Sequence, residues 1–256
     1  FKLIRMPPLT QHVNIWIKYP SNQKYATKLS YEKDVYTKLI NQLPSFDYFT
    51  LNFHHSFTNW LPFYWHGFLQ TTRYTYIIKD LTDLDQVFNN FRENIRREIR
   101  KAEKLVTVEC NDNIEMLYKL NQMTFQRQRL EVPYSLDFLL KLDKACELHH
   151  CRKTFFAVDK DGRVHAAIYI VWDHESAYYL IGGGDPDLRN SGATSLLMWE
   201  AIKFASKVTK QFDFEGSMIE PVERFFRSFG AVQIPYHQII KIKSKLLRAR
   251  QFIKEV

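Results

Sequence analysis

The spacing of apolar residues along the chain predicts helices where they recur every three to four positions, and strands where they alternate or form short runs. In the first hundred residues, this spacing predicts strands at residues 13–18, 48–53 and 74–79, and helices at residues 31–42 and about 83–105. Between them, residues 54–68 hold six aromatic side chains. Such a density is more typical of a core under a loop than of a ligand cage.

The rest of the chain alternates more regularly. Asp161-Gly162 and residues 173–175 separate strand-like runs and predict hairpin turns. The predicted order is two helices (114–128, 135–148), three strands (155–158, 164–172, 176–181), a glycine turn, a helix (192–208), a strand (211–214), a helix (221–229) and a last strand. Antiparallel hairpins followed by a crossover helix predict an α/β fold with a mixed sheet, and a domain boundary near residues 104–110.

Composition narrows the class of protein. The chain has 256 residues, of which 45% are hydrophobic and 25% charged, so disordered and low-complexity architectures are excluded. The longest apolar run, residues 166–172, is much shorter than the ~20 residues that cross a bilayer. Three cysteines are too few for a disulfide framework, and no signal peptide is recognisable. We therefore expect a cytoplasmic protein, or a fragment without its own N-terminus.

The net charge of +8 lies in two segments. Residues 92–104 hold six Lys or Arg against three Glu, and residues 241–256 hold six against one. The first segment places Arg96, Arg97, Arg100 and Lys101 on one helix face, which predicts a site for a phosphate-bearing substrate or, alternatively, a solvated face. The second segment also carries Ile242, Leu246, Leu247, Ile253 and Val256, which fit either transient membrane-surface contact or packing on the first domain.

The glycine turn is the best candidate for anion binding. With Ser191 or Asn190 as N-cap, the first helical amides would be free, and Arg189 would add a full charge beside them. The predicted donor-binding residues are Leu188, Arg189, Asn190, Ser191, Gly192, Ala193 and Thr194. An ordinary loop-to-helix junction is the alternative. No dinucleotide fingerprint, Walker loop or nucleophile elbow is present.

Two carboxylates follow the glycine turn. Asp213 and Glu215 alternate with Phe212 and Phe214, so both are expected on one strand face, where a carboxylate could accept a proton from an amine. Alternatively, Asp213 pairs with a basic residue and Glu215 caps a turn. Cys146, His149, His150 and Cys151 lack a second ligand pair at the usual spacing, so no metal site is predicted.

Several of these segments together are similar to one family. The R-x-x-G turn at residues 189–192, RREIRKAEK at 96–104, FDFEGS at 212–217 and ERFFRSFGA at 223–231 resemble the GNAT N-acyltransferases, in particular their Fem-type branch. That branch includes the peptidoglycan-bridge aminoacyltransferases. The resemblance implies a tandem GNAT-like fold: an incomplete first copy at residues 1–105 that ends in the basic helix, and a full copy at 106–256 with the donor-binding turn.

The resemblance also implies an activity. It predicts transfer of an acetyl or aminoacyl group from acyl-CoA or aminoacyl-tRNA, used as co-substrate and not permanently bound, to an amine on, for example, a cell-wall precursor. tRNA is then a candidate partner and DNA is not. Arg189 and Gly192 match the family's [QR]-x-x-G-x-[GA] motif, whereas Thr194 departs from it. Phe226-Arg227 stands where bridge-forming enzymes have Phe-Lys. With Asp213 and Glu215, Arg227 is therefore expected at the catalytic site, where it holds a phosphate or, alternatively, stabilises negative charge on the attacked carbonyl.

A second hypothesis from another class remains open at this point. The chain could be a non-catalytic GNAT-like module that binds RNA or a phosphorylated precursor. The two hypotheses differ in what they expect between residues 176–181 and 211–214. An open cleft between these strands favours catalysis, and a filled one favours binding only.

Overall fold

The computed structural model describes residues 1–249, which form two compact units. Unit 1 contains residues 1–74 and the segment from residue 234 onward, and unit 2 contains residues 75–233. Strands β3 (Leu69–Ile78) and β9 (Val232–Ile242) each begin in one unit and end in the other. The units therefore do not coincide with a division at residue 105, and two GNAT-like copies with that boundary stay a prediction.

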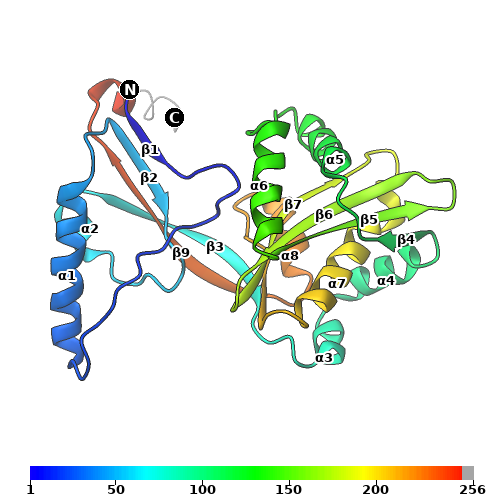
Figure 1. Ribbon diagram of the computed structural model, residues 1–256, viewed down its shortest axis with the longest axis horizontal. Coiled ribbons are helices and arrows are strands. Elements are labelled where there is room, and N and C mark those ends of the chain that lie inside the picture. The colour runs from blue at the N-terminus through cyan, green and yellow to red at the C-terminus, as the bar shows by residue number, and fades with distance from the viewer. Residues whose placement is uncertain (250–256) are drawn as a thin grey trace. The chain divides into compact units, whose positions relative to one another are not determined.

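Unit 1 is built from strands around an aromatic core. Its strands follow the order β1-β2-β9-β3, with β1 at Leu3–Arg5 and β2 at Tyr48–Asn52. Helix α1 spans Tyr25–Gln42 and α2 spans Leu61–Trp65 (Figure 1). The strand predicted at residues 13–18 is wrong, because only Val13 forms a bridge, to Phe53. The expectation that the aromatic segment forms a core is confirmed in part: Phe57, Phe63 and Phe68 are buried, whereas Tyr64 and Trp65 are each 57% exposed. The other buried rings of this core are Tyr36, Phe46, Phe49 and Phe53.

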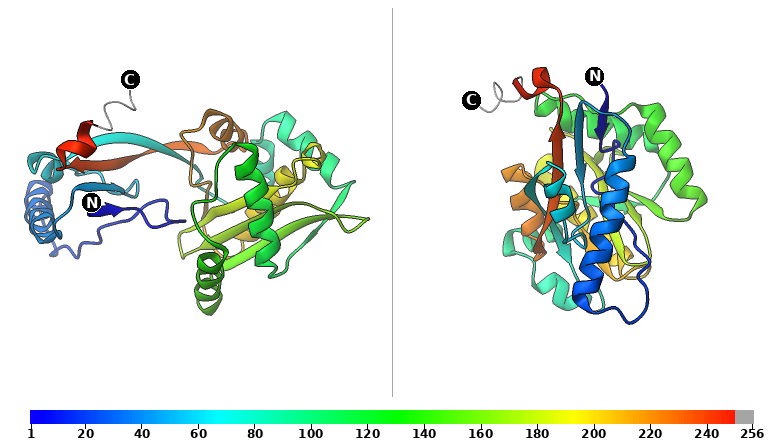
Figure 2. Two further views of the ribbon diagram at one scale, coloured as in Figure 1. Left: turned by 90° about the horizontal axis from the view of Figure 1, so that it is seen from above. Right: turned by 90° about the vertical axis from the view of Figure 1, so that its left-hand side faces the viewer.

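Unit 2 is a mixed sheet between two layers of helices. Its strands follow the order β3-β8-β7-β6-β5-β4. Neighbouring strands are antiparallel, except that β7 and β8 are parallel. Helices α5 and α6 lie on one face, and α4, α7 and α8 lie on the other (Figure 2). The elements are α3 (Leu84–Asn89), α4 (Glu93–Ala102), β4 (Val106–Glu109), α5 (Ile114–Arg127), α6 (Leu136–Leu148), β5 (Arg152–Asp159), β6 (Val164–Trp172), β7 (Ser176–Gly184), η1 (Arg189–Ser191), α7 (Ala193–Ala205), β8 (Gln211–Asp213) and α8 (Glu220–Arg227).

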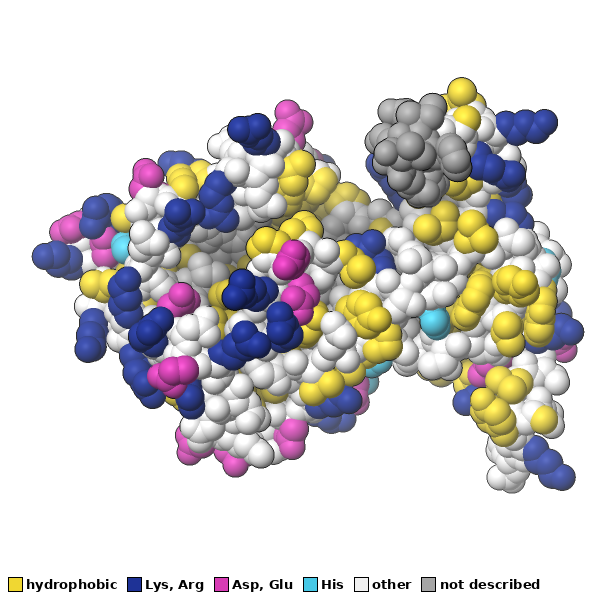
Figure 3. Space-filling view, turned by 180° about the vertical axis from the view of Figure 1, so that it is seen from behind, with side chains coloured by type: hydrophobic (Ala, Val, Ile, Leu, Met, Phe, Trp, Pro, Cys, Tyr) yellow, Lys and Arg dark blue, Asp and Glu magenta, His cyan; other side chains and the backbone are white. Residues whose placement is uncertain are grey.

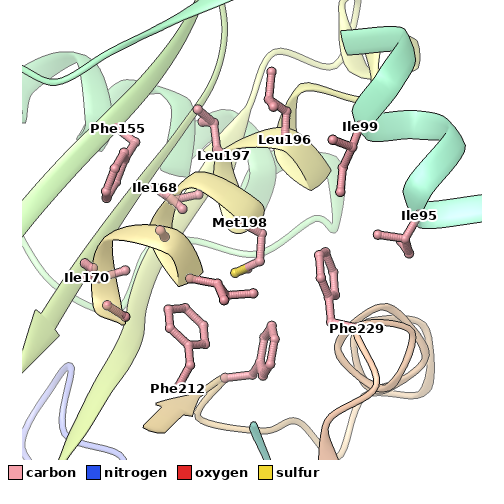
Figure 4. Close-up of a cluster of buried hydrophobic side chains, with 14 of the residues drawn as sticks. Ile95, Ile99, Phe155, Ile168, Ile170, Leu196, Leu197, Met198, Phe212 and Phe229 are labelled. Carbon is pink, nitrogen blue, oxygen red and sulfur yellow. The ribbon is translucent and has the colours of Figure 1, made fainter. Parts of the chain in front are cut away.

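The core of unit 2 explains the amphipathic pattern of α4. Ile95 and Ile99 of α4 are at most 2% exposed and meet Leu196 and Met198 of α7 above the sheet (Figure 4). Full burial of each such side chain contributes about 1.5–3 kcal/mol. The basic residues of α4 alternate with these positions and stay at the surface. Apolar burial alone therefore fixes which face of α4 is basic.

The single helix predicted over residues 83–105 is wrong, because the chain breaks into α3 and α4. At the break, Arg92 has an extended backbone with ψ 147° and donates its amide to the Ser228 carbonyl at 2.9 Å. Gly230 packs so closely that a Cβ there would lie 2.8 Å from the Asn90 carbonyl oxygen. Tertiary contact with the end of α8 thus overrides a helical pattern that continues in the sequence.

In the described part of the chain, no helix is both long and apolar enough to cross a membrane. Of the apolar residues in the predicted C-terminal membrane contact, Ile253 and Val256 lie outside the described residues. Ile242 ends β9, and Leu246 is 68% exposed.

Candidate active site

A pocket lies where β7 ends and α7 begins. β8 pairs in parallel with β7 only from Ser176 to Tyr178, and beyond Tyr178 the two strands are no longer hydrogen-bonded. The pocket has a volume of about 140 Å³. It is lined by Thr124, Arg127, His165, Tyr179, Gly182, Gly183, Gly184, Arg189, Ser191, Ala193 and Thr194. It therefore joins the glycine-rich end of a strand to the predicted donor-binding turn.

The helix start differs by one residue from the predicted cap. Gly192, with φ +79°, holds the N-cap position, while Ser191 ends a short 3-10 turn. The Ser191 hydroxyl accepts a hydrogen bond from the Ala193 amide at 3.3 Å. Within residues 1–249, no acceptor pairs with the amide of Thr194, whereas the Gly192 amide closes the 3-10 turn. The start of α7 thus presents the open N–H group of Thr194 and the positive end of the helix dipole, which together attract anions.

Two arginines border this pocket. Arg189 is exposed at the turn, as predicted, and Arg127 comes from the last turn of α5. Arg127 could not be predicted, because nothing in the spacing of residues 114–128 indicates that the end of α5 reaches the turn. Of the predicted donor residues, Leu188 and Asn190 do not line the pocket. Gly192 lines a neighbouring hollow of about 270 Å³ that shares Arg189 and Thr194 with the pocket.

Helix α4 holds the turn in place. The Lys101 ammonium donates to the Asn190 carbonyl, and the Ser195 hydroxyl donates to Glu98 at 2.7 Å. Gly192 is needed at this contact, since a Cβ there would lie 2.5 Å from the Glu98 carbonyl oxygen. Of the predicted substrate-binding residues, Lys101 therefore touches the turn itself.

The other predicted basic residues of α4 are at its surface. Arg96 forms an ion pair with Glu93 at 2.6 Å, and Arg100 approaches the same carboxylate at 3.7 Å. Arg97 is exposed. Figure 3 shows that Lys and Arg side chains on this view of unit 2 are interspersed with Asp and Glu. Glu93 thus partly neutralises the charge of Arg96 and Arg100, whereas the exposed Arg97 can contact a phosphate.

Polar groups of two elements, α5 and β7, meet at the inner side of the pocket. Burial raises the pKa of Tyr179, so its phenol stays protonated at neutral pH and can donate a hydrogen bond. Its ring occupies the space above Gly182, where a Cβ would lie 1.6 Å from the phenol oxygen. Asn121 donates to the Gly182 carbonyl at 2.8 Å, and the Gly184 amide donates to Thr124 at 3.2 Å.

No group of three or more His, Cys, Asp or Glu side chains that could hold a metal ion occurs within residues 1–249.

Of the two predicted catalytic carboxylates, Asp213 is the last residue of β8 and Glu215 follows the strand. Asp213 is 2% exposed and accepts hydrogen bonds from the Thr75 hydroxyl and, at 2.7 Å, from the Glu215 amide. Neither partner is basic. The alternative in which Asp213 pairs with a basic residue is therefore not seen among the described residues. Glu215 lies past the strand end with φ +56°. Burial raises the pKa of Asp213 to about 6 and, together with the charge of Asp213, raises the pKa of Glu215 well above its usual value.

The carboxylates and the pocket share one edge of the sheet. β7 and β8 are parallel neighbours, so their carboxyl ends point the same way. Neither Asp213 nor Glu215 lines the pocket itself. Arg227, expected beside them, donates instead to Glu223 at 2.9 Å, and Glu223 also accepts a hydrogen bond from the Tyr76 phenol. The phosphate-holding role of Arg227 stays a prediction.

Stability should depend on pH through Asp213. Its folded-state pKa of about 6 exceeds the usual 3.8, so the folded state holds this proton more tightly than the unfolded state. The unfolding free energy should therefore fall as pH rises from about 4 to above 6, by about 3 kcal/mol for this group. Asp213→Asn should remove that part of the pH dependence in urea unfolding measured between pH 4.5 and 7.5. Asp187→Asn, at an exposed carboxylate, serves as control; equal slopes in the wild type and Asp213→Asn would contradict the assignment.

Comparison with known proteins agrees with this geometry. A family model described as an acetyltransferase (GNAT) domain matches residues 89–217, just over half of the chain. The structure of FemX has a TM-score of 0.68 and 13% sequence identity, covering 87% of this chain and 78% of that one. The C-terminal domain of a putative lysylphosphatidylglycerol synthetase from Agrobacterium fabrum has a TM-score of 0.56 and 12% identity, with 80% and 70% covered.

Another similar structure, L-PGS from Bacillus licheniformis, has a TM-score of 0.54 and 9% identity, with 81% of this chain and 71% of that one covered. The sequence matches no protein of curated function. At these identities the solved structures establish the fold, while the family model covers both the basic helix and FDFEGS. The chain belongs to the GNAT acetyltransferase-domain family, and its fold is that of the Fem-like branch.

Proposed function

We propose that this protein transfers an acyl group from a phosphate-bearing carrier to an amine. The observation that carries the proposal is that Arg127, Arg189 and the open amide of Thr194 at the start of α7 all border one pocket. A guanidinium fork and a helix N-terminus both favour phosphate, and charge-assisted hydrogen bonds of this kind are about twice as strong as neutral ones. Phosphate binding here would place the carrier's reactive end near the diverging strands β7 and β8.

The chemistry requires a proton acceptor and a proton donor. As the amine attacks the acyl carbonyl, a C–N bond forms, the bond to the carrier's sulfur or oxygen breaks, and the amine loses a proton. Glu215 is suited to accept that proton, because burial and the neighbouring Asp213 raise its pKa and so make its carboxylate a stronger base than an exposed glutamate. The protonated phenol of Tyr179 can donate to the leaving group.

The carrier could be acyl-CoA or aminoacyl-tRNA. Membership in the family supports acyl-CoA as co-substrate. The side chain of Thr194 narrows the phosphate turn, and Lys101 and Arg97 extend positive charge onto α4, which together favour a larger polyanion. By analogy with FemX, the acceptor would be an amine on a cell-wall precursor.

A binding-only role has its own supporting observation. The Tyr179 and Phe226 rings, 5.7 Å apart between centroids, pack with Phe214 where an open cleft between β7 and β8 is expected for an enzyme. Hydrogen bonds to Asn121 and Thr124 also engage the Gly182 carbonyl and the Gly184 amide, so these backbone groups are not free to bind a substrate. Turnover with radiolabelled acetyl-CoA or aminoacyl-tRNA separates the two functions, because a binding module would retain affinity and release no free carrier.

Arg189→Ala should weaken carrier binding by about 10- to 150-fold, equivalent to losing about 1.5–3 kcal/mol from a charge-assisted hydrogen bond. Isothermal titration with coenzyme A and, separately, with tRNA measures this loss. Arg224→Ala removes an exposed arginine of α8 that does not line the pocket and should bind like the wild type. Unchanged affinity of Arg189→Ala for both ligands would rule out the turn as the carrier site.

A further inference from the structure

Exposed aromatic side chains are confined to unit 1. Among the described residues, the exposed aromatic side chains are Phe1, Trp16, Tyr19, Tyr25, Tyr64 and Trp65, all of them in residues 1–74. In unit 2, the exposed large apolar side chains are all aliphatic or Met. Scattered exposed leucines are ordinary on any protein surface, but grouped exposed aromatic rings indicate an interaction surface.

Helix α2 presents the most ordered part of this surface. Pro62 and Phe63 are buried, and the Phe63 ring packs on Phe53 and Phe68 at 5.5 and 5.3 Å. Because residues three and four apart share a helix face, this anchoring turns Leu61, Tyr64 and Trp65 outward together. Their exposed fractions are 48%, 57% and 57%. We call these three residues, with Lys33, the α2 face; Figure 3 shows hydrophobic side chains gathered on this view of unit 1.

Lysines of α1 accompany the exposed rings. The Lys33 ammonium lies 5.3 Å from the centre of the Trp65 ring, and Lys28 lies 4.4 Å from that of Tyr19. Residues 24–42 contain four lysines and two acids. One of these acids, Glu32, is buried and accepts hydrogen bonds from Tyr19 and Asn59. The charge that α1 offers to a partner is therefore mainly positive.

We infer that the α2 face docks unit 1 on an anionic lipid surface. Trp and Tyr rings favour the boundary between headgroups and acyl chains, and lysines beside them are attracted to anionic headgroups. A protein partner fits less well, because lysine is depleted from protein–protein interfaces. The surface differs from the C-terminal segment suggested by sequence, and it is independent of the proposed acyl transfer.

Vesicle co-sedimentation tests this inference. The full chain should bind vesicles of phosphatidylcholine with 30% phosphatidylglycerol, and bind phosphatidylcholine alone at least tenfold more weakly. The double variant Tyr64→Ser/Trp65→Ser should reduce partition at least tenfold. Lys33→Gln should reduce it about fivefold at low salt, as expected for one lysine near an anionic surface. All three side chains are exposed, so circular dichroism and melting temperature should stay those of the wild type.

Leu246→Ser is the matched control. Leu246 is 68% exposed and belongs to the competing C-terminal segment, so its replacement should leave vesicle binding unchanged. The inference is overturned if the wild type fails to bind anionic vesicles, or if Leu246→Ser loses binding while the double variant keeps it. It is also overturned if Tyr64→Ser/Trp65→Ser instead abolishes concentration-dependent self-association in sedimentation velocity, since the face would then bind a second copy.

Discussion

Replacing Glu215 with Gln should lower kcat by about 10²- to 10⁴-fold, the usual contribution of a positioned general base. Gln has the same shape as Glu but cannot take a proton from the attacking amine. KM for the carrier should change little, because Glu215 does not line the pocket that holds the carrier phosphate. The measurement is steady-state acyl transfer to an amine acceptor, with binding of the carrier measured separately.

The pH profile separates a catalytic role of Glu215 from a structural one. In the wild type, kcat should rise with pH through the raised pKa of Glu215, because only the ionised form accepts a proton. Glu215→Gln should lose that ionisation. Its unfolding free energy should be equal to or higher than that of the wild type at pH 8, since an amide avoids the cost of a desolvated charge.

Glu220→Gln provides the control for these measurements, because Glu220 is an exposed residue in the first turn of α8. It should retain wild-type kcat and pH dependence. Normal turnover in Glu215→Gln would remove Glu215 from the mechanism and leave Asp213 as the remaining carboxylate of this strand end.

Local pattern predicted the regular elements of unit 2 well. β6 runs from Val164 to Trp172, as its continuous apolar run indicates, and α5 begins at Ile114, as predicted. β6 is buried on both faces, which gives a continuous apolar run, and α5 buries one face, which gives a helical period; the sequence alone therefore carries the information. The break between α3 and α4 could not be found in this way, because it depends on Gly230 and Ser228, more than 130 residues away.

The site was predictable only in part, for a related reason. Arg189 and Gly192 carry a local signal, since a glycine turn before a helix has a known affinity for phosphate. Arg127 and Tyr179 reach the same pocket from α5 and β7, and no spacing connects them to the turn. Arg227 was expected beside Asp213 and Glu215. Its guanidinium instead forms an ion pair with Glu223, one helical turn earlier. Side-chain direction depends on such neighbours, which a motif does not include.

Gly192→Ala should be strongly destabilising, because the new methyl group is unfavourable both for the backbone conformation and for packing. An Ala with φ near +79° costs about 1–2 kcal/mol, and overpacking a tight contact costs about 1–3 kcal/mol more. The contact in question is the 2.5 Å approach to the Glu98 carbonyl, which is backbone and cannot rotate away. Together these effects should lower the melting temperature by roughly 5–15 °C, measured by calorimetry.

Gly162→Ala is a control matched in backbone conformation. Gly162 has φ +77°, and a Cβ there meets no atom of residues 1–249 within 4 Å, so the variant bears only the conformational cost. The difference between the two variants isolates the clash between α4 and α7. Because that clash separates Lys101 from Asn190 and Ser195 from Glu98, Gly192→Ala should also bind the carrier more weakly at temperatures where it is fully folded. Equal melting temperatures and equal carrier affinities in the two variants would show that α4 does not hold the phosphate turn in place.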